Sequence, residues 1–258
     1  MTHVNLVVVI PSLNPDEKTV DYVYRLVALG FRDIIVVNDG SSKEYDHYFD
    51  VLSGMPECTV LKHAVNLGKG RAIKTGLNYF LNHYDRSEYL GVVTADSDGQ
   101  HSPEDTMRVA LKLVEDKNSL VLGIRDFNDP LVPAKHRKGS KITTAVFALL
   151  YSKIIKDALT GLRGLPYDFA ATCLQLPGEG FDYEIGMLIT AVREKRVIVE
   201  EKIQTIYYNN NDESHFKPVV DSIKIYALMF KTFVKYSLVS VFSFLIDISL
   251  CGYRVNSV

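Results

Sequence analysis

The sequence predicts an α/β fold with a mostly parallel, doubly wound central sheet flanked by helices. Short apolar runs alternate with stretches of helical spacing through the first half of the chain, and this alternation is typical of β-α-β units. Polar clusters follow several of the apolar runs, as expected where ligands meet the carboxyl ends of parallel strands. With 258 residues, of which 47% are hydrophobic, the chain can bury one large core or two small ones.

The first half contains five apolar runs that we predict to be strands. Each is short and bounded by polar or turn-forming residues, as expected for strands buried on both faces. The predicted strands are residues 4–10, 33–37, 58–61, 89–94 and 119–123. The predicted helices between them are 16–29, which Gly30 closes, 69–81 and 103–115.

The second half is less regular. We predict helices over 141–155, 183–193 and 219–234, a glycine-rich loop over 159–167, an alternating edge strand over 197–206 and a polar loop over 209–214. No stretch rich in Pro, Gly or Ser marks a domain boundary.

Composition excludes some classes of protein. The 29 basic and 31 acidic residues nearly balance, so we expect no nucleic-acid partner. Cys58, Cys173 and Cys251 are odd in number and far apart. They predict neither a disulfide framework nor a cysteine metal site, which is consistent with a reducing compartment. The apolar run at 6–10 lacks a basic region before it and is too short for a signal peptide.

Asp96 and Asp98 follow the fourth predicted strand. Two carboxylates one residue apart in an extended turn can face the same way and bind one Mg²⁺ or Mn²⁺, which commonly also binds substrate phosphates. Such an ion would stabilise the charge on a departing diphosphate. The alternative is a turn with solvated acids. A calcium-binding loop is disfavoured because Gly99 comes too early.

Two further polar clusters allow two interpretations each. Residues 66–72 precede a predicted helix, and its N-terminus with Lys69 and Arg71 suits an anion, although an ordinary helix start has the same pattern. The chain has no P-loop sequence. Asp39 could accept hydrogen bonds from a base or a ribose, or could cap a helix.

Four motifs occur in a characteristic order: Ile10–Asn14, Asn38–Ser42, Asn66–Gly70 and Asp96–His101. In this order they resemble glycosyltransferase family 2, in the branch of dolichyl- or polyprenyl-phosphate sugar synthases. The resemblance covers about residues 4–216. It implies a GT-A fold for a domain at 1–216, followed by an amphipathic and apolar membrane-associated segment at 217–258.

The resemblance implies roles for residues at the donor site. The nucleotide sugar, a UDP- or GDP-hexose, would be bound by Pro11, Leu13, Asp39, Lys69, Asp96 and Arg125. The cation, Mg²⁺ or Mn²⁺, would be held by Asp98 and Gln100, with Asp96 beside it. The first motif departs from the family pattern, because Leu13 and Pro15 stand where Tyr and Glu are common; Asp16 or Glu17 could compensate.

The resemblance also implies roles at the acceptor site. The acceptor phosphate would be bound by Arg137 and Arg163, and the catalytic set would be Asp157, Arg163, Asp182 and Glu184. A polyprenyl phosphate is already an anion, so transfer to it needs alignment and charge stabilisation more than a base. A saccharide hydroxyl would instead need a carboxylate base, for which Asp157, Asp182 and Glu184 are the candidates. The family implies inversion by one in-line displacement.

The C-terminal stretch is amphipathic. Lys217, Lys224, Lys231 and Lys235 share one helical face, beside an apolar face. A basic stripe next to apolar side chains suits an anionic membrane surface, which predicts a location at the cytoplasmic face of the plasma membrane. The alternative is a helix that packs on the protein's own core.

The apolar run that follows, residues 236–251, falls short of the about 20 residues of a membrane span. Residues 233–250 resemble the first part of a GtrA-like membrane domain, of which this would be a truncated start.

The sequence bears on two other functions. A nucleotidyltransferase would have a glycine-rich loop with Arg and Lys after the first strand, and residues 11–14 lack it. A non-catalytic membrane recruitment protein would leave the carboxylates without a role.

Overall fold

The computed structural model describes residues 5–126, 134–204 and 218–255. Within these ranges, the side chains of residues 134–136, 138, 218–219 and 239–255 lie outside the description. The predicted polar loop at 209–214, Lys217 and the boundary predicted at 216/217 fall outside the described residues, so they stay predictions.

A seven-stranded sheet forms the centre of the described chain, in the order β3-β2-β1-β4-β6-β5-β7. All strand pairs are parallel except those of β6, which runs antiparallel to both β4 and β5. The strands are β1 (Leu6–Ser12), β2 (Ile34–Asn38), β3 (Cys58–Lys62), β4 (Gly91–Thr94), β5 (Leu120–Arg125), β6 (Arg163–Pro166) and β7 (Ile198–Ile203). The predicted α/β fold with a mostly parallel sheet is therefore confirmed.

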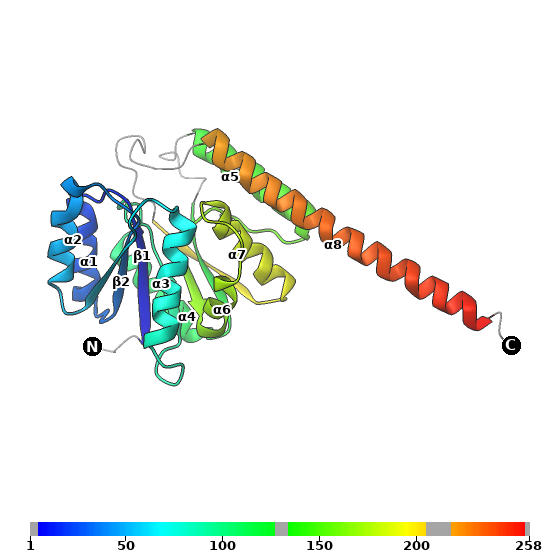
Figure 1. Cartoon of the computed structure of the whole chain (residues 1–258), viewed down its shortest axis with the longest axis horizontal. Coiled ribbons are helices and arrows are strands. Elements are labelled where there is room, and N and C mark those ends of the chain that lie inside the picture. The colour runs from blue at the N-terminus through cyan, green and yellow to red at the C-terminus, as the bar shows by residue number, and fades with distance from the viewer. Residues whose placement is uncertain (1–4, 127–133, 205–217, 256–258) are drawn as a thin grey trace.

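Helices cover both faces of the sheet (Figure 1). They are α1 (Glu17–Leu29), α2 (Asp46–Ser53), α3 (Lys69–His83), α4 (Pro103–Glu115), α5 (Ala134–Tyr151), α6 (Tyr167–Leu174), α7 (Asp182–Arg193) and α8 (Pro218–Val255), with a 3-10 turn at Lys43–Tyr45. Strand residues alternate between two cores. On β1, Val8 and Ile10 pack with α1, α2 and α4, whereas Val7 and Val9 pack with α3, α6 and α7.

The predicted glycine-rich loop at 159–167 is wrong in part, because residues 163–166 form the central strand β6. All four residues of β6 are buried between β4 and β5. A Cβ on Gly164 would lie 3.2 Å from Val121 and 3.3 Å from Leu113, so glycine lets the strand pack closely against both residues. The sequence gives a loop signal there because four residues with one glycine show no strand periodicity.

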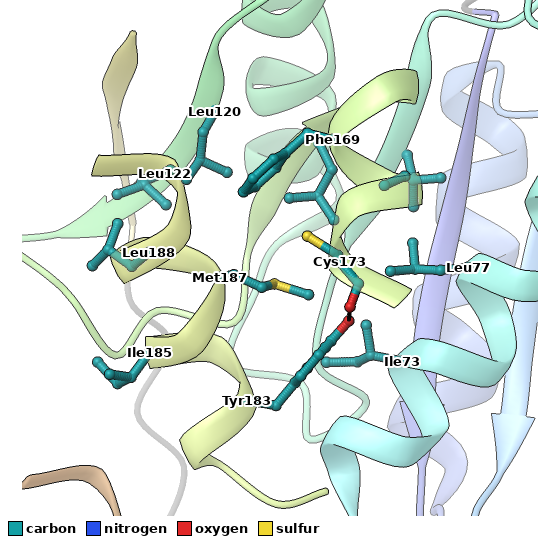
Figure 2. Close-up of a cluster of buried hydrophobic side chains, with 14 of the residues drawn as sticks. Ile73, Leu77, Leu120, Leu122, Phe169, Cys173, Tyr183, Ile185, Met187 and Leu188 are labelled. Atoms are coloured by element: carbon teal, nitrogen blue, oxygen red, sulfur yellow. Dashed lines mark hydrogen bonds between the residues drawn. The ribbon is translucent and has the colours of Figure 1, made fainter. Parts of the chain in front are cut away.

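The core on the α3 side joins α6 and α7 to the sheet (Figure 2). The hydroxyl of Tyr183 donates to the Cys173 carbonyl at 2.8 Å, and both residues are buried. Phe169, Leu77 and Met187 fill the space around this pair (Figure 2). Because Tyr183 stands in the first turn of α7, this packing fixes the start of α7 beside α3.

The first part of α8 belongs to the protein's own core. Ile225 and Met229 are buried, the Tyr151 hydroxyl donates to the Met229 carbonyl at 2.8 Å, and the Arg193 guanidinium stacks on Tyr236. Figure 1 shows α8 lying along α5 and then continuing beyond the rest of the molecule. Of the two interpretations of this stretch, packing on the core holds for this face of the helix.

Among the described residues, no helix is both long enough and apolar enough to cross a bilayer. The apolar run at 236–251 and the GtrA-like resemblance at 233–250 fall largely on side chains outside the description, so they stay predictions.

Candidate functional site

The polar clusters predicted to converge do meet at one edge of the sheet. Asp39 and Asp96 follow the carboxyl ends of the parallel strands β2 and β4, which flank β1. Pro11, near the end of β1, is buried opposite Val37, and Leu13 follows it half-buried. The N-termini of α3 and α7 lie against this edge, as the contacts of Lys69 show.

Asp39 is buried and holds the segment that leads into α3. Its carboxylate accepts hydrogen bonds from the backbone N–H groups of Leu67 at 2.9 Å and Gly68 at 2.8 Å. It also contacts Nδ1 of His63 at 2.7 Å, while Nε2 of His63 contacts Thr75 at 2.9 Å. These contacts use three of the about four hydrogen bonds that the carboxylate of Asp39 can accept. Asp39 therefore caps no helix, and it leaves little capacity for a base or ribose.

Lys69, the first residue of α3, lies between two carboxylates. Its Nζ is 2.7 Å from Oδ1 of Asp96 and 3.1 Å from Oε1 of Glu184. Burial opposes the charge on this ammonium, but Asp96 and Glu184 together raise its pKa above the ordinary value. The lysine thus joins the end of β4 to the first turn of α7, and it is a fixed positive charge at the site.

Close approach of backbones explains the glycines of the 66–72 cluster. A Cβ on Gly68 would lie 2.4 Å from the Glu179 carbonyl oxygen, and a Cβ on Gly70 would lie 2.6 Å from Cβ of Tyr183. Gly68 also has a φ of 102°. Arg71, predicted to suit an anion, is paired with Glu179 at 2.6 Å. Glycine is required here because α3 and the loop before α7 touch.

Asp96 and Asp98 ionise differently. Burial opposes ionisation of Asp96, but Lys69 and His101 lower the pKa of its carboxyl below the ordinary value. Burial, and then the charge of Asp96, raise the pKa of Asp98. Asp98 accepts a hydrogen bond from the Gln100 backbone N–H at 3.0 Å, so the backbone and not the side chain of Gln100 makes the contact.

The turn that holds these carboxylates is tied down on both sides. The Thr19 hydroxyl donates to the Ser97 carbonyl at 2.9 Å. Nε2 of His101 lies 3.5 Å from Oδ2 of Asp96. Sequence reasoning missed the contact of His101, although the residue stands inside the fourth motif.

A divalent cation fits the chemistry of this turn, although no three His, Cys, Asp or Glu side chains within the described ranges already form a metal cluster. Mg²⁺ commonly takes one or two carboxylates and completes its shell with water and substrate phosphates. The charge of Asp96 disfavours ionisation of Asp98, and a cation would offset that repulsion. Asp98 and Asp96 are the residues that would hold it, with Gln100 beside them.

Arg163 lies in the core of the protein. Its side chain is 0% exposed, and its guanidinium donates to the carbonyls of Thr160 at 2.8 Å, Ala158 at 3.2 Å and Glu184 at 2.5 Å. Burial lowers its pKa. Three backbone carbonyls occupy the Arg163 guanidinium, and its predicted role as an acceptor-phosphate ligand or catalytic group stays a prediction. Arg163 connects the 158–160 loop to α7.

Asp157 forms a buried ion pair. It is 1% exposed and pairs with Arg125 in a bidentate manner, with Oδ2 2.6 Å from Nε and Oδ1 2.9 Å from Nη2. The predicted role of Asp157 as a general base stays a prediction. Asp157 positions Arg125, which stands at the end of β5.

The remaining predicted residues lie at the helix starts. Glu184 is buried, and burial raises its pKa while Lys69 opposes the shift. Asp182 opens α7, and its Oδ1 accepts from the Gly180 backbone N–H at 3.1 Å. Arg137 lies in the first turns of α5. The arrangement thus brings Lys69, Asp96 and Glu184 together and gives Arg125 a separate partner.

Comparison with known proteins identifies the group of proteins that share this arrangement. The profile of glycosyl transferase family 2 matches residues 7–171. An uncharacterised protein of Methanocaldococcus jannaschii is 26% identical over 204 residues, covering 78% of this chain and 81% of that protein. A UDP-N-acetylglucosamine–dolichyl-phosphate N-acetylglucosaminyltransferase of Methanococcus voltae is 26% identical over 223 residues, covering 77% of this chain and 84% of the relative.

Solved structures share the fold. Mannosyl-3-phosphoglycerate synthase from Rubrobacter xylanophilus superposes with a TM-score of 0.61 at 17% identity, covering 92% of this chain and 74% of that one. TarS of S. aureus, residues 1–349 in complex with UDP-GlcNAc, superposes with a TM-score of 0.55 at 14% identity, covering 87% and 65%. At these identities the likeness shows the fold alone, which is the GT-A arrangement.

Proposed function

The chain belongs to glycosyltransferase family 2, and from this premise we propose that it transfers a hexose from a UDP- or GDP-sugar to a polyprenyl phosphate at the cytoplasmic face of a membrane. One observation carries the proposal for the donor. Lys69 holds a fixed positive charge between Asp96 and Glu184, beside Asp98, where parallel strands end. A nucleoside diphosphate with a divalent cation matches that set of charges.

The acceptor proposal has its own support. A relative that covers most of this chain is named as a transferase to dolichyl phosphate, and the same acceptor chemistry is proposed here. Exposed apolar side chains on α8, among them Ile223, Phe230 and Val234, lie on the helix that also bears Lys231 and Lys235. Apolar side chains next to ammonium groups suit an anionic membrane surface.

The reaction follows from the charges. An oxygen of the acceptor phosphate attacks the anomeric carbon while the bond from that carbon to the nucleoside diphosphate breaks, so configuration inverts. The nucleophile is already an anion, so no proton is removed. A cation held by Asp98 and Asp96 would supply charge stabilisation to the leaving diphosphate. Lys69 contributes a fixed positive charge that stabilises the diphosphate. Asp157 orients Arg125, whose guanidinium would contribute a second positive charge.

Transfer to a saccharide hydroxyl is the second candidate function. It is favoured by the burial of Glu184, which raises the pKa of its carboxyl, because a carboxylate with a higher pKa is a stronger base. Against it, Lys69 occupies Oε1 of Glu184 at 3.1 Å.

A transfer assay decides between these functions. A panel of UDP-hexoses and GDP-mannose would be incubated with and without a short polyprenyl phosphate, and with Mg²⁺, Mn²⁺ or EDTA. We expect a lipid-linked product from one donor, lost with EDTA and in Asp98→Ala, and retained in the exposed control Asp50→Ala. Donor binding with transfer only to a saccharide would establish the second candidate. Failure to bind any donor would contradict both and leave membrane recruitment.

Membrane contact through α8 is tested separately. We expect the protein to sediment with vesicles that contain phosphatidylglycerol. Lys231→Glu with Lys235→Glu should weaken this binding, whereas Lys43→Glu, an exposed lysine on the opposite part of the fold, should not. Equal binding of all variants would contradict a role for α8.

A further inference from the structure

The charged side chains at the end of β4 pair with one another. Nζ of Lys69 lies 2.7 Å from Oδ1 of Asp96 and 3.1 Å from Oε1 of Glu184. The second oxygen of Asp96, Oδ2, lies 3.5 Å from Nε2 of His101. Each oxygen of Asp96 thus faces a nitrogen of the protein, so a cation that bound this carboxylate would have to share it with Lys69.

Lys69 is held in this position from several sides. Its side chain is 15% exposed, and that of Glu184 is 4% exposed. The ring centroid of Phe181, the residue before α7, lies 5.2 Å from Nζ of Lys69. The preceding residue, Gly68, is fixed because its backbone N–H donates to the Asp39 carboxylate at 2.8 Å. The ammonium group is therefore a positive charge that the fold keeps at the end of β4.

This charge opposes the binding of a divalent cation at the same turn. Like charges a few ångströms apart repel each other strongly where water is largely excluded. In the described part of the chain, no three His, Cys, Asp or Glu side chains meet as a metal cluster. Mg²⁺ commonly takes its remaining ligands from water and substrate phosphates. The side chains of this turn alone therefore suit only weak binding of a cation.

A diphosphate changes this balance, because it offers negative oxygens to both positive charges. Lys69 can donate to one phosphate in a charge-assisted hydrogen bond, and a cation beside Asp98 can bind another. Once the ammonium group faced the phosphate, the Asp96 carboxylate would be released toward the cation. Lys69 would keep Glu184 as its second partner, so it would not lose both carboxylates at once.

We propose that Lys69 is the counter-ion of Asp96 until the donor binds, and that its ammonium group then moves to the diphosphate of the donor. The divalent cation consequently binds together with the nucleotide, and only weakly without it. This inference rests on the proposed nucleotide-sugar donor and adds how the two ligands of that site depend on each other. Because the coupling between two ligands is reciprocal, the cation should raise the affinity for nucleotide by the same factor.

Binding of Mn²⁺ to the full chain tests this exchange, with free Mn²⁺ measured by electron paramagnetic resonance in the presence and absence of UDP or GDP. In the wild type, the nucleotide should lower the Kd for Mn²⁺ roughly fiftyfold. In Lys69→Met, Mn²⁺ without nucleotide should bind roughly tenfold more tightly, because the repelling charge is gone. The effect of the nucleotide on this Kd should then shrink to roughly fivefold.

The matched control is Lys74→Met. Lys74 lies on the same helix, and its side chain is 11% exposed, but it pairs with Glu179 at 3.2 Å. Its removal should leave the Kd for Mn²⁺ unchanged. Thermal unfolding checks that each variant is folded. If Lys69→Met lowers Tm because buried carboxylates lose their partner, Lys69→Met with Glu184→Gln removes one charge of each sign and should also bind Mn²⁺ more tightly than the wild type.

Other results would overturn the exchange or the function on which it rests. Binding of UDP or GDP with no change in the Kd for Mn²⁺ would overturn the exchange and leave the proposed donor intact. An unchanged Mn²⁺ affinity in the folded Lys69 variants, or an equal gain in Lys74→Met, would show that Lys69 has no such role. Failure of both nucleotides to bind would contradict the proposed function itself, and this inference with it.

Discussion

Arg163 shows how burial decides the role of a charged residue. Sequence motifs place it in a loop near substrate, but its guanidinium lies in the core and donates to three backbone carbonyls. A buried charge of this kind persists because each donor is satisfied. It holds the 158–160 loop against the carbonyl of Glu184, and thus fixes the start of α7 that faces Lys69.

We predict that Arg163→Met lowers the free energy of unfolding by about 3 to 5 kcal/mol, because three buried carbonyls lose their donor. Urea denaturation measures this. The control Arg71→Met removes a half-exposed pair with Glu179 and should cost less than about 1 kcal/mol. A loss of activity in Arg163→Met with unchanged stability would contradict this and support the predicted catalytic role of Arg163.

Asp157 acts on the reaction through Arg125. We predict that Asp157→Asn, which keeps the shape but removes the charge, lowers kcat/KM about a hundredfold, because a misplaced guanidinium loses alignment with the substrate. Steady-state kinetics of transfer measure this. In a double-mutant cycle with Arg125→Gln the two losses should not add. Additive losses would show that Asp157 acts independently, and the control Asp168→Asn, paired with Arg196 instead, should keep activity.

At the scale of elements, β6 joins the two halves of the sheet. It lies antiparallel between β4 and β5, and its close approach to β4 depends on Gly91. A Cβ on Gly91 would lie 2.1 Å from the Leu165 carbonyl oxygen. Backbone cannot give way as a flexible side chain can, so this contact fixes both strands and, with them, the turn at Asp96.

We predict that Gly91→Ala destabilises the fold by about 2 kcal/mol or more, as forced overpacking does. Gly139→Ala is the control: a Cβ there meets nothing within 4 Å, and alanine in a helix should stabilise by about 0.5 to 1 kcal/mol. Thermal unfolding followed by circular dichroism compares the two. Opposite shifts in Tm are expected, and two shifts of the same sign would contradict this account of β6.

At the scale of the whole molecule, the helix α8 packs into the core of the α/β body at one end and extends beyond that body at the other (Figure 1). Met229 is 0% exposed and Ile225 is 2% exposed, whereas Phe230 and Val234 on the same helix are exposed. One face of α8 therefore attaches it to α5 and α7, and the face that bears Phe230 and Val234 is exposed.

We predict that Met229→Ala releases α8 at a cost of about 2 to 5 kcal/mol for that contact, without unfolding the sheet. Hydrogen exchange should accelerate at residues 221–236 while β1 stays protected. Phe230→Ala, an exposed neighbour, should change neither. Faster exchange throughout the sheet in Met229→Ala would show instead that α8 is required for the body to fold.

The sequence alone determined the parallel part of the fold and the place of the site. Apolar runs such as 33–37 and 89–94 indicate buried strands by themselves, and Asp39 and Asp96 come two residues after them. Because the carboxyl ends of parallel strands meet at one edge, convergence of these residues follows from local pattern. The four ordered motifs also indicated the family that the comparisons show.

The tertiary structure decided what each side chain contacts. Local pattern cannot show that the Arg163 guanidinium reaches Glu184, that Asp157 pairs with Arg125 or that His63 reaches Asp39, because these contacts join residues from 21 to 32 positions apart. The sequence did not predict strand β6 for the same reason. Its four residues are held by neighbours on β4 and β5, so its conformation comes from packing and not from its own sequence.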